Sequence, residues 1–249
     1  MSIRLACRAL AAAIAAMAVA AAPAAADGKG KGKGYKWLFD GSKKSFERWT
    51  QAPNGSFELR KDKTIVSVGG LGMLWYPAKQ YGDFSLKLQF RDERTDDGYS
   101  NSGVFVRFPD LRDVPSDERP ECGKLDAALT SQAWVAIYCG QEIQIYDGPE
   151  GEPQKTGSIY NFDPLDLTQA MPTPKGKWND YEIRVVGQHY TIIRNGVVIN
   201  EFDNTPGKQS SRAGDPPTDQ RQFEAGYIGL QNHSTNDRIA FRKVRIKKL

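Results

Sequence analysis

Short runs in which apolar and polar residues alternate recur along most of this 249-residue chain, and they decide its fold class. The clearest is FSLKLQF at residues 84–90, where four apolar side chains alternate with three polar ones. Alternate residues of a strand point to opposite faces, so such a run buries one face and leaves the other wet. Similar runs occupy residues 64–68, 104–108, 134–138, 142–146, 181–186, 190–194, 197–202, 227–231 and 241–246.

About ten short strands without a convincing amphipathic helix predict an all-β sandwich or barrel. Asn195-Gly196 separates two of the runs and suits a tight type I′ hairpin turn. We therefore expect mainly antiparallel pairing, with residues 126–132 as the one candidate for a short helix. No proline-rich linker divides the chain, which favours one domain.

The N-terminus has the order of a secretory signal peptide. Residues 1–26 carry two arginines, an apolar stretch and a small-residue exit, and GKGKGKG follows at residues 28–34. We predict a signal peptide at 1–26, a Gly/Lys linker at 27–35, and a domain at 36–249. The protein would be secreted, periplasmic or on the cell surface, without membrane insertion once the signal is removed. The linker leaves open a weak contact with an anionic envelope polymer.

The net charge and the number of cysteines limit which partners and cofactors we expect. The net charge is only +4, and removing the signal takes away two arginines and no acid, which argues against nucleic acid. Cys122 and Cys139 remain as a pair in an exported chain, so we expect a structural disulfide. Neither they nor the two histidines have zinc spacing, and the acidic residues at 92–97 lack a calcium-loop pattern. We expect no cofactor, and the sequence leaves a divalent metal open.

The segment QEIQIYD, residues 141–147, has the composition of a site. Glu142 and Gln144 share one strand face, while the isoleucines between them face the core. Asp147 joins Glu142 on that face only if a bulge intervenes. Two carboxylates about 5 Å apart would suit retaining glycoside cleavage. The alternative is a solvated strand face with no catalytic role.

Other polar and aromatic residues could complete such a site. Arg107 is expected to point outward, with a fork of donors for sugar oxygens or for the Glu142 carboxylate, where it could equally form a plain ion pair. His233 is the better placed of the two histidines for acid–base chemistry, although a lone loop histidine is often merely solvated. Tyr160 and Trp178 could offer ring faces to a pyranose, unless they belong to the core.

Several segments together resemble the 3-keto-disaccharide hydrolase domain family, over about residues 37–249. The match is carried by LFDGSKKSFERW, LWYPAKQYGDFSLKLQFR, NSGVFVRF, EIQIYD, TGSIYNF, GKWNDYEIRVVGQHYTIIRNGVVI and GYIGLQNH, followed by IAFRKVRIKKL. The resemblance implies a concanavalin A-like jelly-roll β-sandwich with antiparallel strands. Residues 110–133 look like an insertion beyond the family pattern.

The resemblance also implies a substrate, a glycoside already oxidised to a ketone at C3. The ketone acidifies the C2 proton, so a base can remove it, the aglycone can leave from C1, and water can then add in a formal hydrolysis. We hypothesise that Glu142 or His233 handles the proton, with Tyr160 as a further acid. The residues expected to contact the sugar are Asn101, Arg107, Gln144, Asp147 and Trp178.

Two other functions remain open. EIQIYD also resembles the EIDI(x)E strand of laminarinase-type glucanases, with Glu142 at the first Glu, Gln144 in place of the middle Asp, and Asp147 at the last Glu. The loss of that Asp weakens the case for a classical two-carboxylate glycosidase. The third interpretation is a non-catalytic carbohydrate-binding module, because jelly rolls serve both purposes.

Overall fold

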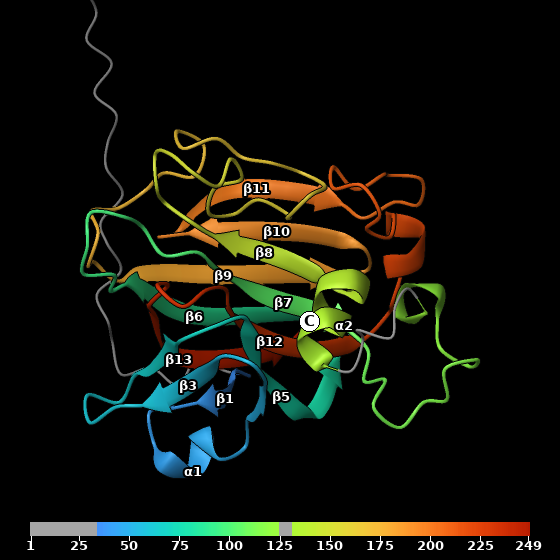
Figure 1. The fold of residues 1–249 in the computed structure, drawn as a ribbon, viewed down its shortest axis with the longest axis horizontal. Helices are drawn as coiled ribbons and strands as arrows, with labels where there is room; N and C mark the ends of the chain where they lie inside the picture. The colour runs from blue at the N-terminus through green and yellow to red at the C-terminus, as the bar shows by residue number, and fades with distance from the viewer. Residues whose placement is uncertain (1–33, 125–130) are drawn as a thin grey trace, which may run out of the picture. The chain divides into compact units, whose positions relative to one another are not determined.

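The computed structural model describes residues 34–124 and 131–249, which belong to one compact unit, Lys33–Leu249. Within this unit two antiparallel sheets pack face to face (Figure 1). The predicted signal peptide, almost all of the Gly/Lys linker and most of the candidate helix at 126–132 lie outside the described residues. The all-β antiparallel sandwich is confirmed.

The larger sheet has eight strands in the order β11-β10-β9-β6-β13-β4-β3, with β1 paired to β13. Its strands are β1 (Lys36–Phe39), β3 (Ser56–Leu59), β4 (Ile65–Val68), β6 (Phe84–Asp92), β9 (Asn179–Val186), β10 (His189–Arg194), β11 (Val197–Asp203) and β13 (Ile239–Lys248).

The smaller sheet has five strands in the order β2-β5-β12-β7-β8. Its strands are β2 (Thr50–Ala52), β5 (Gly72–Tyr81), β7 (Ser102–Phe108), β8 (Gln141–Ile145) and β12 (Gly226–Asn232). The helical segments are α1 (Lys43–Phe46), α2 (Gln132–Cys139) and the 3-10 turns η1 (Glu121–Gly123) and η2 (Thr218–Arg221).

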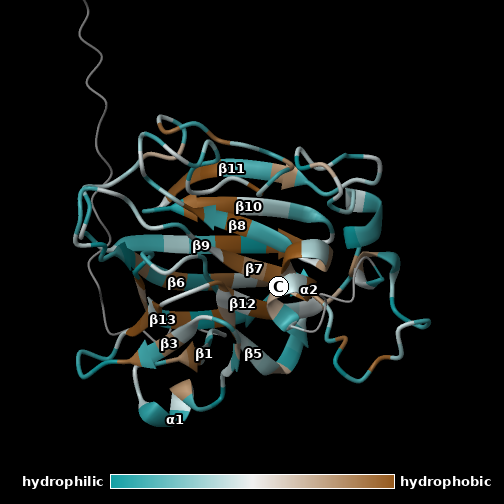
Figure 2. Cartoon of the chain, viewed as in Figure 1, coloured by the Kyte–Doolittle hydropathy of each residue, from teal (hydrophilic) through white to brown (hydrophobic). Residues whose placement is uncertain are grey.

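The core lies between the sheets and follows the alternation in the sequence. In β6, every second residue from Phe84 to Phe90 is at most 3% exposed. Apolar side chains of β7, β8 and β12 meet them from the smaller sheet, and Figure 2 shows brown segments concentrated in the strands, while the loops are mostly teal or white. Burying two such faces against each other is the main stabilising contribution to a sandwich.

The β10–β11 hairpin has the predicted turn. Arg194 pairs with Val197, and the two turn residues Asn195 and Gly196 have φ of +50° and +84°. Positive φ at both central positions is what a type I′ turn requires.

Residues 134–138, predicted as a strand, lie in α2 instead. Ser131 caps this helix by accepting a hydrogen bond from the Ala133 N–H, and α2 packs against β7. The buried side chains Ala133 and Ala136 face Phe105 and Phe108, so the helix covers part of the outer face of the five-stranded sheet (Figure 1). The expected disulfide is present, joining Cys139 at the end of α2 to Cys122.

Candidate functional site

Glu142 projects from the outer face of the five-stranded sheet. Its neighbours Ile143 and Ile145 are 0% and 2% exposed and belong to the core, so the predicted direction of each side chain in β8 is confirmed. The expected open, wetted face is not found, because Glu142 is only 7% exposed and Gln144 is fully buried.

Residues 156–160 cover the free edge of β8 and help to bury this face. The N–H of Gln144 donates to the carbonyl of Ser158, and the N–H of Tyr160 donates to the carbonyl of Glu142. The segment therefore extends the sheet beyond β8 and places Tyr160 beside Glu142.

The environment of Glu142 favours its neutral form. Burial raises the pKa of this carboxyl to about 8, and the Glu152 charge adds to the effect. The positive charge of His233 and a hydrogen bond from the Gln231 amide oppose it without cancelling it. At neutral pH, Glu142 is therefore a protonated acid that can donate a hydrogen bond or a proton.

His233 follows β12 and is held by Asp237, four residues later. The ring Nδ1 lies 2.9 Å from Asp237 Oδ2, and this hydrogen bond raises the pKa of His233 against the opposing effect of burial. Asp237 is itself fixed: its Oδ1 accepts from the Asn101 N–H at 3.0 Å, and its Oδ2 accepts from the Ser234 hydroxyl at 2.7 Å. Burial opposes the ionisation of Asp237, but these bonds lower its pKa, so it stays a carboxylate.

Tyr160 completes the group of proton-carrying side chains. Its hydroxyl lies 3.2 Å from Glu152 Oε2 and donates to that carboxylate. Burial, followed by the charges of Glu152 and Glu142, raises the pKa of the phenol above its usual value. Tyr160 contacts Glu152 directly, and the Glu152 charge also raises the pKa values of Glu142 and His233.

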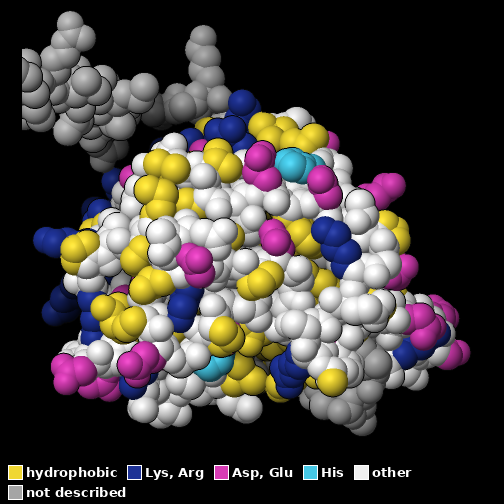
Figure 3. All heavy atoms as spheres, turned by 90° about the horizontal axis from the view of Figure 1, so that it is seen from above, with side chains coloured by type: hydrophobic (Ala, Val, Ile, Leu, Met, Phe, Trp, Pro, Cys, Tyr) yellow, Lys and Arg dark blue, Asp and Glu magenta, His cyan; other side chains and the backbone are white. Residues whose placement is uncertain are grey.

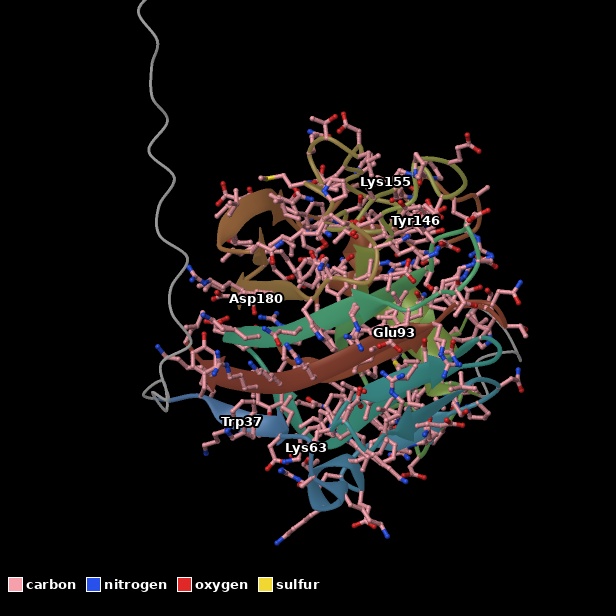
Figure 4. All side chains as sticks on the ribbon, turned by 90° about the vertical axis from the view of Figure 1, so that its left-hand side faces the viewer. Trp37, Lys63, Glu93, Tyr146, Lys155 and Asp180 are labelled. Atoms are coloured by element: carbon pink, nitrogen blue, oxygen red, sulfur yellow. A yellow bond between two sulfur atoms is a disulfide. The ribbon has the colours of Figure 1, made fainter. Side chains whose placement is uncertain are left out.

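A hollow of about 470 Å³ opens at the edge of the sandwich where β7 begins and where β8 and β12 end. Its lining includes His233, Asp237 and Glu152. Tyr146, which lies on the same loop as Glu152 and also lines the hollow, is labelled in Figure 4. Glu142 is not part of the lining, but the charges of His233 and Glu152 affect its pKa. The full lining is Arg94, Tyr99, Asn101, Tyr146, Gly151, Glu152, Pro153, His233, Ser234 and Asp237.

Asn101 lines this hollow and carries an unused, buried acceptor. Its side chain is 8% exposed, and its Oδ1 has no hydrogen-bond partner among the described residues. A buried amide oxygen without a partner costs free energy that a ligand hydroxyl could recover.

Arg107 does not reach this site, and the prediction that its side chain points outward is wrong. It is 1% exposed and donates to the carbonyls of Gly82, Gly187 and Phe223. The β7–β12 register shifts beside it, and its φ is +60°. The bulge turns the guanidinium into the far end of the sandwich, where it ties three loops together.

Asp147 and Trp178 also have other partners. Both carboxylate oxygens of Asp147 bind the guanidinium of Arg194, so this residue does not pair with Glu142 across a sugar. The Trp178 ring lies between the guanidinium groups of Arg91 and Arg242, at 4.4 and 4.0 Å. Gln144 is fully buried and absent from the lining of the hollow.

The structure adds residues that the sequence did not single out, mainly Asp237, Glu152 and Arg94. Arg94 lies 3.7 Å from Asp237 and contributes positive charge to the hollow. The i, i+4 spacing of His233 and Asp237 was visible in the sequence, but in a loop it does not define a contact. His189, the other histidine, pairs with Asp203, and Figure 3 shows the two histidines (cyan) far apart.

Within residues 34–124 and 131–249, no group of three or more His, Cys, Asp or Glu could hold a metal ion. No helix in the same ranges is long and apolar enough to span a membrane.

Comparison with known proteins adds family information to this geometry. No curated protein matches the chain. Two crystal structures from Parabacteroides distasonis, each named "putative glycosyl hydrolase", are similar. The first has 26% identity and a TM-score of 0.61, and the alignment covers 86% of this chain and 99% of that one. The second has 22% identity and a TM-score of 0.58, with 87% and 94% covered.

A Bacillus subtilis protein with a galectin-like fold shares the architecture at 11% identity and a TM-score of 0.52, over 83% of this chain and 92% of that one. The family model described as the 3-keto-alpha-glucoside-1,2-lyase-like domain matches residues 34–247. The chain therefore belongs to the 3-keto-alpha-glucoside-1,2-lyase-like domain family, a carbohydrate-active family.

Proposed function

We propose that this protein is an exported enzyme that cleaves 3-keto-glycosides by removing the C2 proton and expelling the aglycone from C1. The observation that carries the proposal is the neutral, buried carboxyl of Glu142 beside the ordered His233–Asp237 pair. Family membership supplies the substrate class. The Cys122–Cys139 disulfide fits an oxidising compartment.

His233 acts as the base in this proposal. Asp237 accepts a hydrogen bond from Nδ1, which leaves Nε2 free to take the proton from C2 of the sugar. The electron pair of the C2–H bond then moves toward the C3 ketone and forms an enolate.

Glu142 stabilises that enolate. A carboxylic acid that stays protonated at neutral pH can donate a hydrogen bond to the developing oxyanion at C3. The low exposure of Glu142 strengthens this interaction, because little water competes for it.

Tyr160 supplies a proton to the leaving oxygen when the C1–O bond breaks and the C1–C2 double bond forms. Its raised pKa keeps the phenol protonated throughout the neutral range. Asn101 orients the sugar, with its unpartnered Oδ1 accepting a hydrogen bond from a ring hydroxyl. In a second step water adds across the C1–C2 double bond: its oxygen bonds to C1 and one of its protons restores Tyr160, while His233 returns its proton to C2, so the overall change is a hydrolysis.

The proposal is tested by offering the purified protein a chromogenic glucoside and the corresponding 3-keto-glucoside. We expect aglycone release from the ketone alone, and Glu142→Gln should reduce it by about 10²-fold or more while sugar binding persists. Glu150→Gln, at a nearby loop position outside the lining, is the matched control. Cleavage of the unoxidised glucoside would indicate a two-carboxylate glycosidase. Binding of both sugars without turnover would indicate a carbohydrate-binding module, and either result overturns the proposal.

A further inference from the structure

The outer face of the eight-stranded sheet carries a row of basic side chains that the proposed reaction does not use. The sequence of β13, IAFRKVRIKK, holds five basic residues and no acid. β6 continues the row beside β13. We define the basic face as Lys87, Arg91, Arg242, Arg245 and Lys247.

Aromatic rings hold several of these cations in place. Trp178 lies between Arg91 and Arg242, with the guanidinium carbons 4.4 and 4.0 Å from the ring centroid. Arg245 lies over both Trp37 and Tyr35, at 5.5 and 5.6 Å. A stacked guanidinium keeps its N–H donors at the ring edge, so less side-chain entropy is lost when it binds an anion.

Carboxylates neutralise only part of this row. Glu93 pairs with Arg91, and Glu182 pairs with Lys87. Arg245 and Lys247 make no ion pair with any acidic residue in the described ranges. Because the whole chain has a net charge of only +4, two such cations beside Lys87, Arg91 and Arg242 mark an uneven distribution of charge.

We propose that the basic face binds an anionic polysaccharide, one that carries carboxylate or sulfate groups. Arginine forks match these anions in geometry, and a sheet face presents side chains at a regular spacing that suits an extended polymer. Trp37 is 43% exposed and offers its free surface to a sugar ring at the same place.

Two other anionic partners fit this face less well. Single-stranded nucleic acid stacks its successive bases on several open aromatic rings, whereas the Trp178 ring already packs against two guanidinium groups and Trp37 is the only exposed ring of β1, β6 and β13. A lipid surface needs apolar anchors, and Trp37 is the one exposed large apolar side chain of β1, β6 and β13, all of which the structure describes in full.

The basic face and the hollow lie on different sides of the sandwich. Figure 4 shows Trp37 and Asp180 toward the left of the view and Tyr146 toward the right. A polymer held on the basic face would leave the hollow open, so the enzyme could stay attached to a matrix while it works.

The test measures binding of the folded protein to calcium-free polygalacturonate in low salt, with dextran, duplex DNA and vesicles of anionic phospholipid in parallel. We expect binding to polygalacturonate above the other three, falling as salt increases. The double variant Arg245→Gln/Lys247→Gln should bind about tenfold more weakly, because each lost cation removes a salt-dependent contact.

The control Lys44→Gln/Lys61→Gln removes the same charge from exposed positions elsewhere and should bind like the wild type. Both variants should keep the wild-type melting temperature and turnover of a small soluble substrate. Equal binding by the two variants overturns the proposal, as does equal binding of dextran. Tighter binding of DNA or of vesicles overturns it in favour of those partners.

Discussion

Gly103 lies directly against Glu142: a Cβ added to the glycine would come within 2.7 Å of Glu142 Oε1 and 2.8 Å of Glu142 Cγ. The two residues come from neighbouring strands, β7 and β8. The missing side chain on β7 therefore gives the Glu142 carboxyl the space in which it lies.

The first prediction follows from this contact. Gly103→Ala should push the carboxyl out of position and reduce turnover by about 10²-fold, since shifts near 1 Å cost that much in an active site. Gly82→Ala, where the nearest heavy atom to the added Cβ would be 3.3 Å away, is the control and should stay active. Wild-type turnover in Gly103→Ala would remove Glu142 from the proposed site.

Glu142 should also make stability depend on pH. Its pKa is raised from 4.5 to about 8 on folding, so the native state keeps a proton that the unfolded state releases. Its contribution to the free energy of unfolding is therefore highest below about pH 4.5 and is lost progressively as the pH rises toward 8. Relative to Glu142→Gln, the wild-type melting temperature should fall by about 5 °C or more between pH 5 and pH 8. Parallel melting curves across this range would contradict the raised pKa.

Asp237 should set the acid limb of the pH–rate profile. His233 must be neutral to accept a proton, and Asp237 raises its pKa. Asp237→Asn should move the acid limb of kcat/KM to lower pH by about one unit and reduce kcat by about tenfold or more. Ser234→Ala removes a hydrogen bond to the same Oδ2 without touching the ring, and should move the limb much less. An unmoved acid limb in Asp237→Asn would show that His233 is not the titrating base.

Arg107 should matter for stability and not for substrate affinity. Its guanidinium binds the carbonyls of Gly82, Gly187 and Phe223 at once, which a lysine ammonium cannot reproduce. Arg107→Lys should lower the free energy of unfolding by about 2 kcal/mol and leave KM unchanged. Arg184→Lys, at an exposed position, should change neither. A large rise in KM for Arg107→Lys would restore the original expectation of a sugar contact.

Much of the sandwich was predictable because the strand period is strong wherever one face is wet. The strand prediction failed at residues 134–138, since SQAWVAIYC is apolar almost throughout and suits a buried helix as well as a strand. β5 was missed for a related reason: MLWYPA is continuously apolar and contains a proline, so it shows no alternation.

The site was predictable only in part. Parity in β8 gave the direction of Glu142, but its burial depends on residues 156–160, which carry no alternation of their own. Strict alternation along β7 would point Arg107 to the outer face. A bulge that the sequence does not mark changes the direction of its side chain. Asp237 and Glu152 lie in loops, where no periodicity predicts which side chains will meet.

The segment at 156–160 also restricts what else can bind here. It already occupies backbone hydrogen-bonding groups of Glu142 and Gln144 along the edge of β8. An extended peptide from the surroundings therefore cannot add itself as a further strand beside Glu142. Recognition next to this carboxyl is left to side chains, which favours a compact, hydroxyl-rich guest over an unfolded protein.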